Sequence, residues 1–186
     1  MSALNWIDVL MIGIMIRMFY VGVKTSFFIE LFKLLGVVFA IFITHHYYDD
    51  FGKLLHQRVH FAPIFADTVS FALLWIVVVL IFKLVRDALL LLFKMHANPA
   101  IDQWGGFIVA LSRGVLLCSL TFMLVYVSGV KYLVKYANRS LSGPYLRELS
   151  LDVYQGCFEG FVSKFFEREN LNIRIFEVRD VKDDHK

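Results

Sequence analysis

The hydrophobic positions of the chain gather into four long blocks. These run over Leu4–Val23, Phe27–Thr44, Phe71–Phe93 and Gly106–Val127. Each block is close to the roughly 20 residues that a helix needs to cross about 30 Å of hydrocarbon. The pattern therefore predicts an all-α polytopic membrane protein with four transmembrane helices.

None of the four blocks is free of charged residues. A central charge costs about 2.5–3.5 kcal/mol on the insertion scale, whereas each Leu, Ile, Phe or Val returns about 0.3–0.6 kcal/mol. The free energy of inserting a single block with two charges is therefore close to zero. We expect the blocks to pair their charges inside a bundle. A large soluble helix bundle is the disfavoured alternative, because little polar surface is left to cover four apolar blocks. The charged positions are Asp8, Arg17, Glu30, Lys33, Lys83, Arg86, Asp87 and Arg113.

Two further segments predict amphipathic helices outside the membrane. Segment 45–65 has apolar residues at helical spacing, as expected of a helix lying at the interface. Segment 145–168 repeats apolar residues in steps of three and four, which is typical of an amphipathic C-terminal helix. Its apolar positions are Leu146, Leu149, Val153, Cys157, Phe161 and Phe165. Beyond it, Ile173–Val178 is compatible with a strand.

Composition and charge divide the chain in two. The apolar residues AVILMFWYC make up 59% of the chain, which disfavours an ordinary soluble enzyme. Charged residues number 16 in the first 130 positions and 19 in the last 56. We interpret residues 1–130 as a four-helix membrane domain and residues 131–186 as a polar C-terminal extension. The net charge of +3 is too small to indicate nucleic acid binding.

Glu30 and Arg113 are the strongest candidates for an intramembrane ion pair. Each is flanked by apolar residues near the beginning of a block, where an unpaired charge is costly. We expect the two side chains to face each other and to join two helix hairpins. A proton- or solute-linked switch and snorkelling to the interface are the alternatives.

Two more carboxylates and five glycines stand at helix starts and breaks. Asp8 and Asp102 are expected to cap free N–H groups and to interact favourably with the helix dipole. The glycines are expected to permit turns or close helix contacts, and the chain is expected to turn at Asn98-Pro99 and at Gly105-Gly106. They are Gly22, Gly36, Gly105, Gly106 and Gly114.

No pattern in the chain indicates catalysis or a cofactor. His45 and His46, with Asp49 and Asp50, form a loose metal-like cluster, but a wet interfacial loop explains them better. No glycine-rich phosphate loop is present, and no serine or cysteine has a recognisable base. We therefore expect no enzyme activity, no metal and no cofactor.

Three motifs, taken together, resemble a known family. They are Asn5-Trp6-Ile7-Asp8; then Gly22, Glu30 and Gly36 with the His46-Tyr47-Tyr48 end; and Asp102-Gln103-Trp104-Gly105 followed by Ser112-Arg113-Gly114. In order and spacing they resemble the bacterial colicin V production protein family (CvpA), over about residues 3–150. The chain departs from the family pattern at Gln103 and at Val109-Ala110, and the second departure is expected to loosen a close helix contact.

The resemblance implies an integral inner-membrane protein with a part in toxin production and envelope function. We expect an accessory or scaffold protein in the lipid bilayer that acts through a membrane or envelope protein partner. The alternative is a small homo-oligomeric transporter or channel with Glu30 and Arg113 lining the path. The start of the chain lacks Lys and Arg while Lys24 follows the first block, so both termini are expected outside the cytoplasm.

Overall fold

The structure, a computed structural model, is helical throughout the part of the chain that it describes. It describes residues 6–59, 62–92, 99–140, 142–162, 164 and 171–180, and no strand occurs among them. The all-α prediction is confirmed. The elements are α1 (Trp6–Lys24), α2 (Phe27–Val59), α3 (Pro63–Leu92), α4 (Pro99–Val127), α5 (Lys131–Arg139), α6 (Gly143–Cys157), the π-helical turn η1 (Phe158–Val162) and α8 (Ile173–Asp180).

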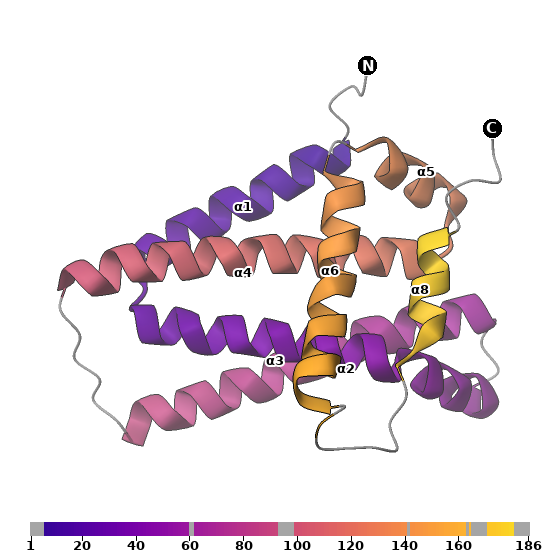
Figure 1. Ribbon diagram of the computed structural model, residues 1–186, viewed down its shortest axis with the longest axis horizontal. Helices are drawn as coiled ribbons and strands as arrows, with labels where there is room; N and C mark the ends of the chain where they lie inside the picture. Colours follow the sequence, from indigo (N-terminus) through magenta and orange to yellow (C-terminus); the bar gives the residue numbers. More distant parts are fainter. Residues whose placement is uncertain are drawn as a thin grey trace.

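Helices α1 to α4 are long and apolar enough to cross a membrane. They pack in the order α1, α4, α2, α3, so that helix α4 lies between α1 and α2 (Figure 1). Half of the most apolar stretch of α4 is buried, against 17% of the corresponding stretch of α3. Helix α4 is therefore the centre of the bundle, and α3 presents most of its apolar surface outward, as a helix in contact with lipid does.

The interfacial segment predicted from residue 45 onward is part of α2. The helix continues past Thr44 to Val59 and pairs with the first part of α3 in a long hairpin. Gly52 sits against Asp67 in this hairpin, since an added Cβ would lie 2.3 Å from the Asp67 carboxylate oxygen. The segment was predicted as a helix lying at the interface, whereas residues 45–59 continue α2, because they pack against α3.

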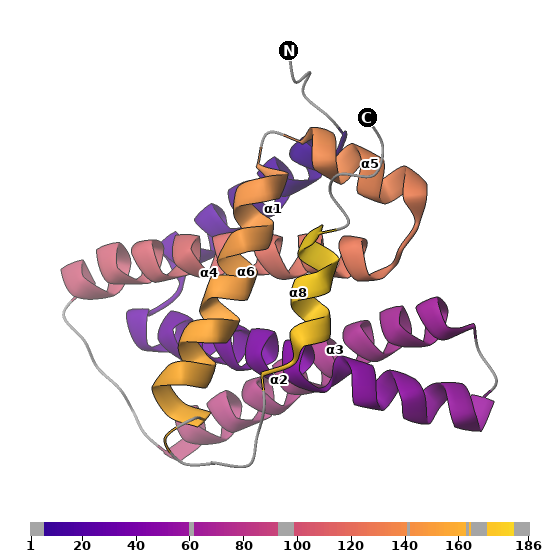
Figure 2. The ribbon, with the colours of Figure 1, turned by 45° about the vertical axis from the view of Figure 1, so that its right-hand side comes forward.

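Helix α6 crosses the face made by α4 and α2 (Figures 1 and 2). The amphipathic prediction was right about the helix but wrong about its buried face and its end. The predicted apolar positions up to Cys157 are only half-buried, and the α-helix ends at Cys157 before the turn η1. Phe161 and Phe165 lie outside the residues whose side chains the structure describes. The side chains that α6 buries are Arg147, Ser150, Leu151 and Tyr154.

The polar residues of α6 are buried because the surface they meet is also polar. Ser150 Oγ lies 2.8 Å from Nε2 of His45, and the hydroxyl of Tyr154 lies 3.0 Å from Nδ1 of His46. The guanidinium of Arg147 stacks over the Tyr126 ring, 5.0 Å from its centroid. The two histidines, expected in a wet loop, are therefore buried in α2 and hold α6.

Residues 173–180 form a helix rather than the strand that their composition allows. The Asn172 side-chain amide donates hydrogen bonds to the backbone oxygens of His45, at 3.0 Å, and His46, at 3.2 Å. Arg174 then makes ion pairs with Asp49 of α2 and, at 3.3 Å, with Asp67 of α3. Helix α8 is thus fixed on the α2–α3 hairpin by side chains, and no strand of the described residues offers it a backbone partner.

Small residues bring α1 and α4 close together. Gly106, Ala110 and Gly114 follow one another at four-residue steps on α4, a spacing that lets helix backbones approach in membranes. A Cβ on Gly22 of α1 would lie 2.5 Å from that of Ala110, so this alanine does not loosen the contact as expected. Gly36 makes the equivalent approach between α2 and α3, where an added Cβ would lie 2.9 Å from Phe82.

Gly105 and Gly106 do not form the expected turn. They lie inside α4, which begins at Pro99, and both face the α1–α2 connection. An added Cβ would lie 2.7 Å from the Phe27 ring at Gly105 and 2.6 Å from the Thr25 backbone oxygen at Gly106. These glycines serve close packing, because the Phe27 ring at Gly105 and the backbone of the α1–α2 connection at Gly106 occupy the space of the missing side chains.

We expect Gly106→Ala to destabilise the bundle by about 1–3 kcal/mol, since the methyl group must displace backbone rather than a flexible side chain. Unfolding in mixed micelles with increasing dodecyl sulfate would measure the change. Gly13→Ala is the matched control, because nothing lies within 4 Å of its added Cβ. Equal stability of the two variants would contradict the proposed backbone contact.

Candidate functional site

A buried carboxylate stands in the first turn of α2. Glu30 is 0% exposed and has a cation on each side. Its Oε1 accepts a hydrogen bond from Nζ of Lys33, one turn further along α2, at 2.6 Å. Its Oε2 lies 3.0 Å from Nη1 of Arg113 on α4. The two residues singled out in the sequence are therefore in contact, and Lys33 is a third member that the pair prediction did not include.

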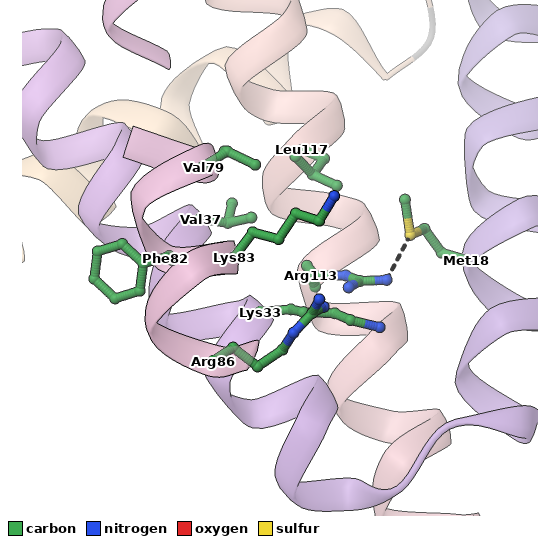
Figure 3. A pocket seen from close by; sticks show the side chains of 10 residues that line it. Met18, Lys33, Val37, Val79, Phe82, Lys83, Arg86, Arg113 and Leu117 are labelled. Carbon is green, nitrogen blue, oxygen red and sulfur yellow. Dashed lines mark hydrogen bonds between the residues drawn. The ribbon is translucent and has the colours of Figure 1, made fainter. Parts of the chain in front are cut away.

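Arg113 links the pair to α1. Its Nη2 donates a hydrogen bond to the sulfur of Met18 at 3.0 Å, drawn as the dashed line in Figure 3. The Nε of Arg113 is buried and has no hydrogen-bond partner in the described part of the chain. One side chain of α4 thus contacts both α2 and α1 and still has a donor free.

A pocket of about 230 Å³ lies beside this cluster, between the four membrane helices. Basic side chains from three helices reach into it in Figure 3. They are Lys33 of α2, Lys83 and Arg86 of α3, and Arg113 of α4. The rest of the lining is apolar and includes Met18, Val37, Val79, Phe82 and Leu117. A pocket lined by both cationic and apolar side chains favours an amphiphilic anion over a neutral or positively charged ligand.

The carboxylates near the pocket do not balance its cations. Glu30 contacts Lys33 and Arg113, and Asp87 contacts Arg86, its neighbour on α3, at 2.6 Å. Lys83 makes no hydrogen bond or ion pair with any residue that the structure describes. Four cations therefore share two carboxylates. The signal was present in the sequence, since Lys83 and Arg86 are three residues apart inside an apolar block, but nothing in the sequence shows that they meet Arg113.

Asp8 and Asp102 lie apart from this site. Asp8 is buried in the first turn of α1, where a carboxylate favours the helix dipole. Its Oδ1 also accepts hydrogen bonds from the hydroxyls of Ser140 and, at 3.2 Å, Ser142, and so attaches the α5–α6 connection to the start of α1. Asp102 lies in the first turns of α4, and its side chain is outside the described part of the chain.

In the described part of the chain, the remaining candidates are not arranged as a metal site. Among the described residues, no group of three or more His, Cys, Asp or Glu side chains is placed to hold a metal ion. His45 and His46 contact α6 instead. The two cysteines, Cys118 and Cys157, are free thiols. The charged cluster of Glu30, Lys33 and Arg113, with the pocket beside it, is thus the candidate functional site.

We expect Glu30→Gln to destabilise the protein by about 3–5 kcal/mol, because it leaves the buried guanidinium of Arg113 without a counter-charge. Arg113→Gln should cost less, because Lys33 still pairs with Glu30. The double variant should cost no more than Glu30→Gln alone, as in a double-mutant cycle of a direct pair. Unfolding in dodecyl sulfate mixed micelles measures all three. Arg17→Gln is the control, since Arg17 is exposed on α1. Strict additivity of the two single changes would count against the pair.

One comparison with known proteins gives a family. A protein-family model described as Colicin V production protein matches residues 7–151. This match confirms the resemblance seen in the sequence motifs, with nearly the same boundaries. No curated protein and no solved structure matches the chain.

Proposed function

Since the chain belongs to the colicin V production protein family, we propose that it is an inner-membrane accessory or scaffold protein without catalytic activity of its own. Its four apolar helices make it a multi-pass membrane protein tied to colicin V production. We propose that it supports toxin production and envelope function by binding a membrane or envelope protein partner.

The outward face of α6 is the observation that carries this proposal. The inward face is fixed on α2 and α4 by buried side chains, among them Ser150 and Tyr154. On the outward face, Glu148 and Asp152 are exposed, one turn apart, and make no hydrogen bond or ion pair with described residues. A rigidly held helix with free acidic groups suits a partner with a basic surface, because charge complementarity gives specificity and speeds association.

We expect Glu148→Lys combined with Asp152→Lys to abolish toxin production while leaving membrane insertion and the amount of protein unchanged. Deleting α6 would not be informative, because the deletion would expose the buried faces of α2 and α4. Lys131→Glu with Lys135→Glu on α5 is the control, with a charge change of equal size. The measurement is the zone of growth inhibition around colicin V-producing cells. Full production by the α6 variant would overturn the partner proposal.

A photo-crosslinking residue at Asp152, used in native membranes, would identify what lies against α6. A single different protein, captured from this position but not from the outward position Leu91 of α3, supports the scaffold proposal. Capture of a second copy of the chain supports the alternative, a homo-oligomeric transporter or channel. The pocket lined by Arg113 favours that alternative. Glu30, however, is fully buried and paired, which suits a rigid contact between helices better than a channel gate.

We also propose that the chain ends lie outside the cytoplasm. The start of α1 and the α5–α6 connection share one end of the bundle through Asp8, while Lys24 lies at the other end. A cysteine at Tyr132, an exposed position on α5, should react with a membrane-impermeant maleimide in intact cells. A cysteine at Lys24 should react only after permeabilisation.

Labelling of the cysteine at Lys24 in intact cells, with the cysteine at Tyr132 labelled only after permeabilisation, would show the opposite orientation. The native thiols should give little background in this experiment. Cys118 is buried, and burial raises the pKa of the Cys157 thiol, which lowers its reactive thiolate fraction. A variant with both cysteines replaced by serine is the control.

A further inference from the structure

We propose that the basic pocket between the four membrane helices binds the phosphate group of an anionic ligand, and that an anionic phospholipid of the bilayer is the favoured source. The inference does not depend on the scaffold role. It rests on the convergence of cations, on the depth of the pocket in the bundle and on the composition of its walls.

The first observation is the surplus of positive charge. Four basic side chains, Lys33, Lys83, Arg86 and Arg113, line a pocket of about 230 Å³ and share two carboxylates, Glu30 and Asp87. Like charges in a medium of low dielectric constant repel one another strongly. An anion in the pocket would reduce this repulsion. The more repulsion it relieves, the higher its binding affinity.

The second observation is that the basic side chains reach the pocket from different directions. Lys33, Lys83 and Arg113 belong to three different helices, and their side chains extend into one space in Figure 3. The buried Nε of Arg113 has no hydrogen-bond partner in the described part of the chain, and neither does the ammonium group of Lys83. A phosphate group presents its oxygens in a tetrahedral arrangement, so it can accept from donors in more directions than a planar carboxylate can.

The depth of the pocket points to a lipid. Lys33 lies six residues after the start of α2 and Arg86 six residues before the end of α3, so each is about 9 Å from the same end of the bundle at 1.5 Å per residue. Long basic side chains at this depth reach the level of the headgroups. Basic pockets between transmembrane helices are known to hold anionic headgroups.

The walls of the pocket suit the rest of a lipid molecule. Val37, Val79, Phe82 and Leu117 give an apolar lining beside the cations. Lys83 is exposed, and so are Leu80 and Leu84 beside it on α3, the helix with the most outward apolar surface. The pocket is therefore open where the bundle faces hydrocarbon, and an acyl chain can leave it sideways into the bilayer.

The test measures binding to the purified full-length chain in neutral detergent by native mass spectrometry. The probes are phosphatidylglycerol, phosphatidylcholine and inorganic phosphate. Phosphatidylcholine carries the same phosphodiester with a compensating cation, so it controls for the lipid chains. We expect phosphatidylglycerol to be retained and phosphatidylcholine to be removed under the same collision energy.

The double variant Lys83→Gln with Arg86→Gln should bind phosphatidylglycerol about thirtyfold more weakly, since each basic residue near an anionic lipid contributes about fivefold in affinity. Lys131→Gln with Lys135→Gln, on exposed residues of α5 outside the pocket, is the matched control and should bind as the parent does. If the double variant does not fold, the single variant Lys83→Gln replaces it and should bind phosphatidylglycerol about fivefold more weakly. This variant should fold, because the exposed Lys83 makes no hydrogen bond or ion pair in the described part of the chain.

The outcomes separate the two sources of the phosphate group. Loss of phosphatidylglycerol in the variant, with no competition from millimolar inorganic phosphate, supports the lipid. Displacement of the lipid by inorganic phosphate, again lost in the variant, supports the same site with a soluble phosphate as its ligand. Equal retention of the two lipids, or unchanged binding by the variant, overturns the proposal.

Discussion

The carboxylate of Glu30 sets the condition on which the rest of the bundle depends. An unpaired charge buried inside a membrane bundle is costly, and Glu30 is fully buried between Lys33 and Arg113. Because Arg113 is on α4, the pairing requires α2 and α4 to be neighbours. Arg113 also reaches Met18 on α1, so one buried charge determines the order of three helices.

The close packing of the helices makes this ionic contact possible. Charged groups attract strongly only at short range and in the absence of water, and both conditions need helices that lie close together. Gly22, Ala110 and Gly106 supply the small surfaces between α1 and α4, and Gly36 supplies one between α2 and α3. The same closeness gathers Lys83 and Arg86 beside Arg113, so that the arrangement which neutralises one carboxylate leaves an excess of cations around a pocket.

The opposite end of the bundle is held by buried hydrogen bonds, with the ion pairs of Arg174 beside them. Ser150 and Tyr154 of α6 meet His45 and His46 of α2, and Asn172 fixes α8 to the same pair of residues. Buried hydrogen bonds of this kind specify one position of a helix, because any shift leaves donors and acceptors unsatisfied. The helix α6 therefore has a defined outward face, as a docking surface requires.

The sequence alone determined the environment and the main elements of this protein. Four apolar blocks of about 20 residues require membrane helices, and an isolated buried charge requires a partner, so the fold class, the family and the candidates Glu30 and Arg113 were all predictable. Only the tertiary structure decided that Gly105 and Gly106 lie inside α4, and that α6 buries Ser150 and Tyr154. It also brought Lys83 to the pocket. Apolar periodicity reports only which positions avoid water, whereas the place of a polar side chain depends on a partner that is distant in the chain.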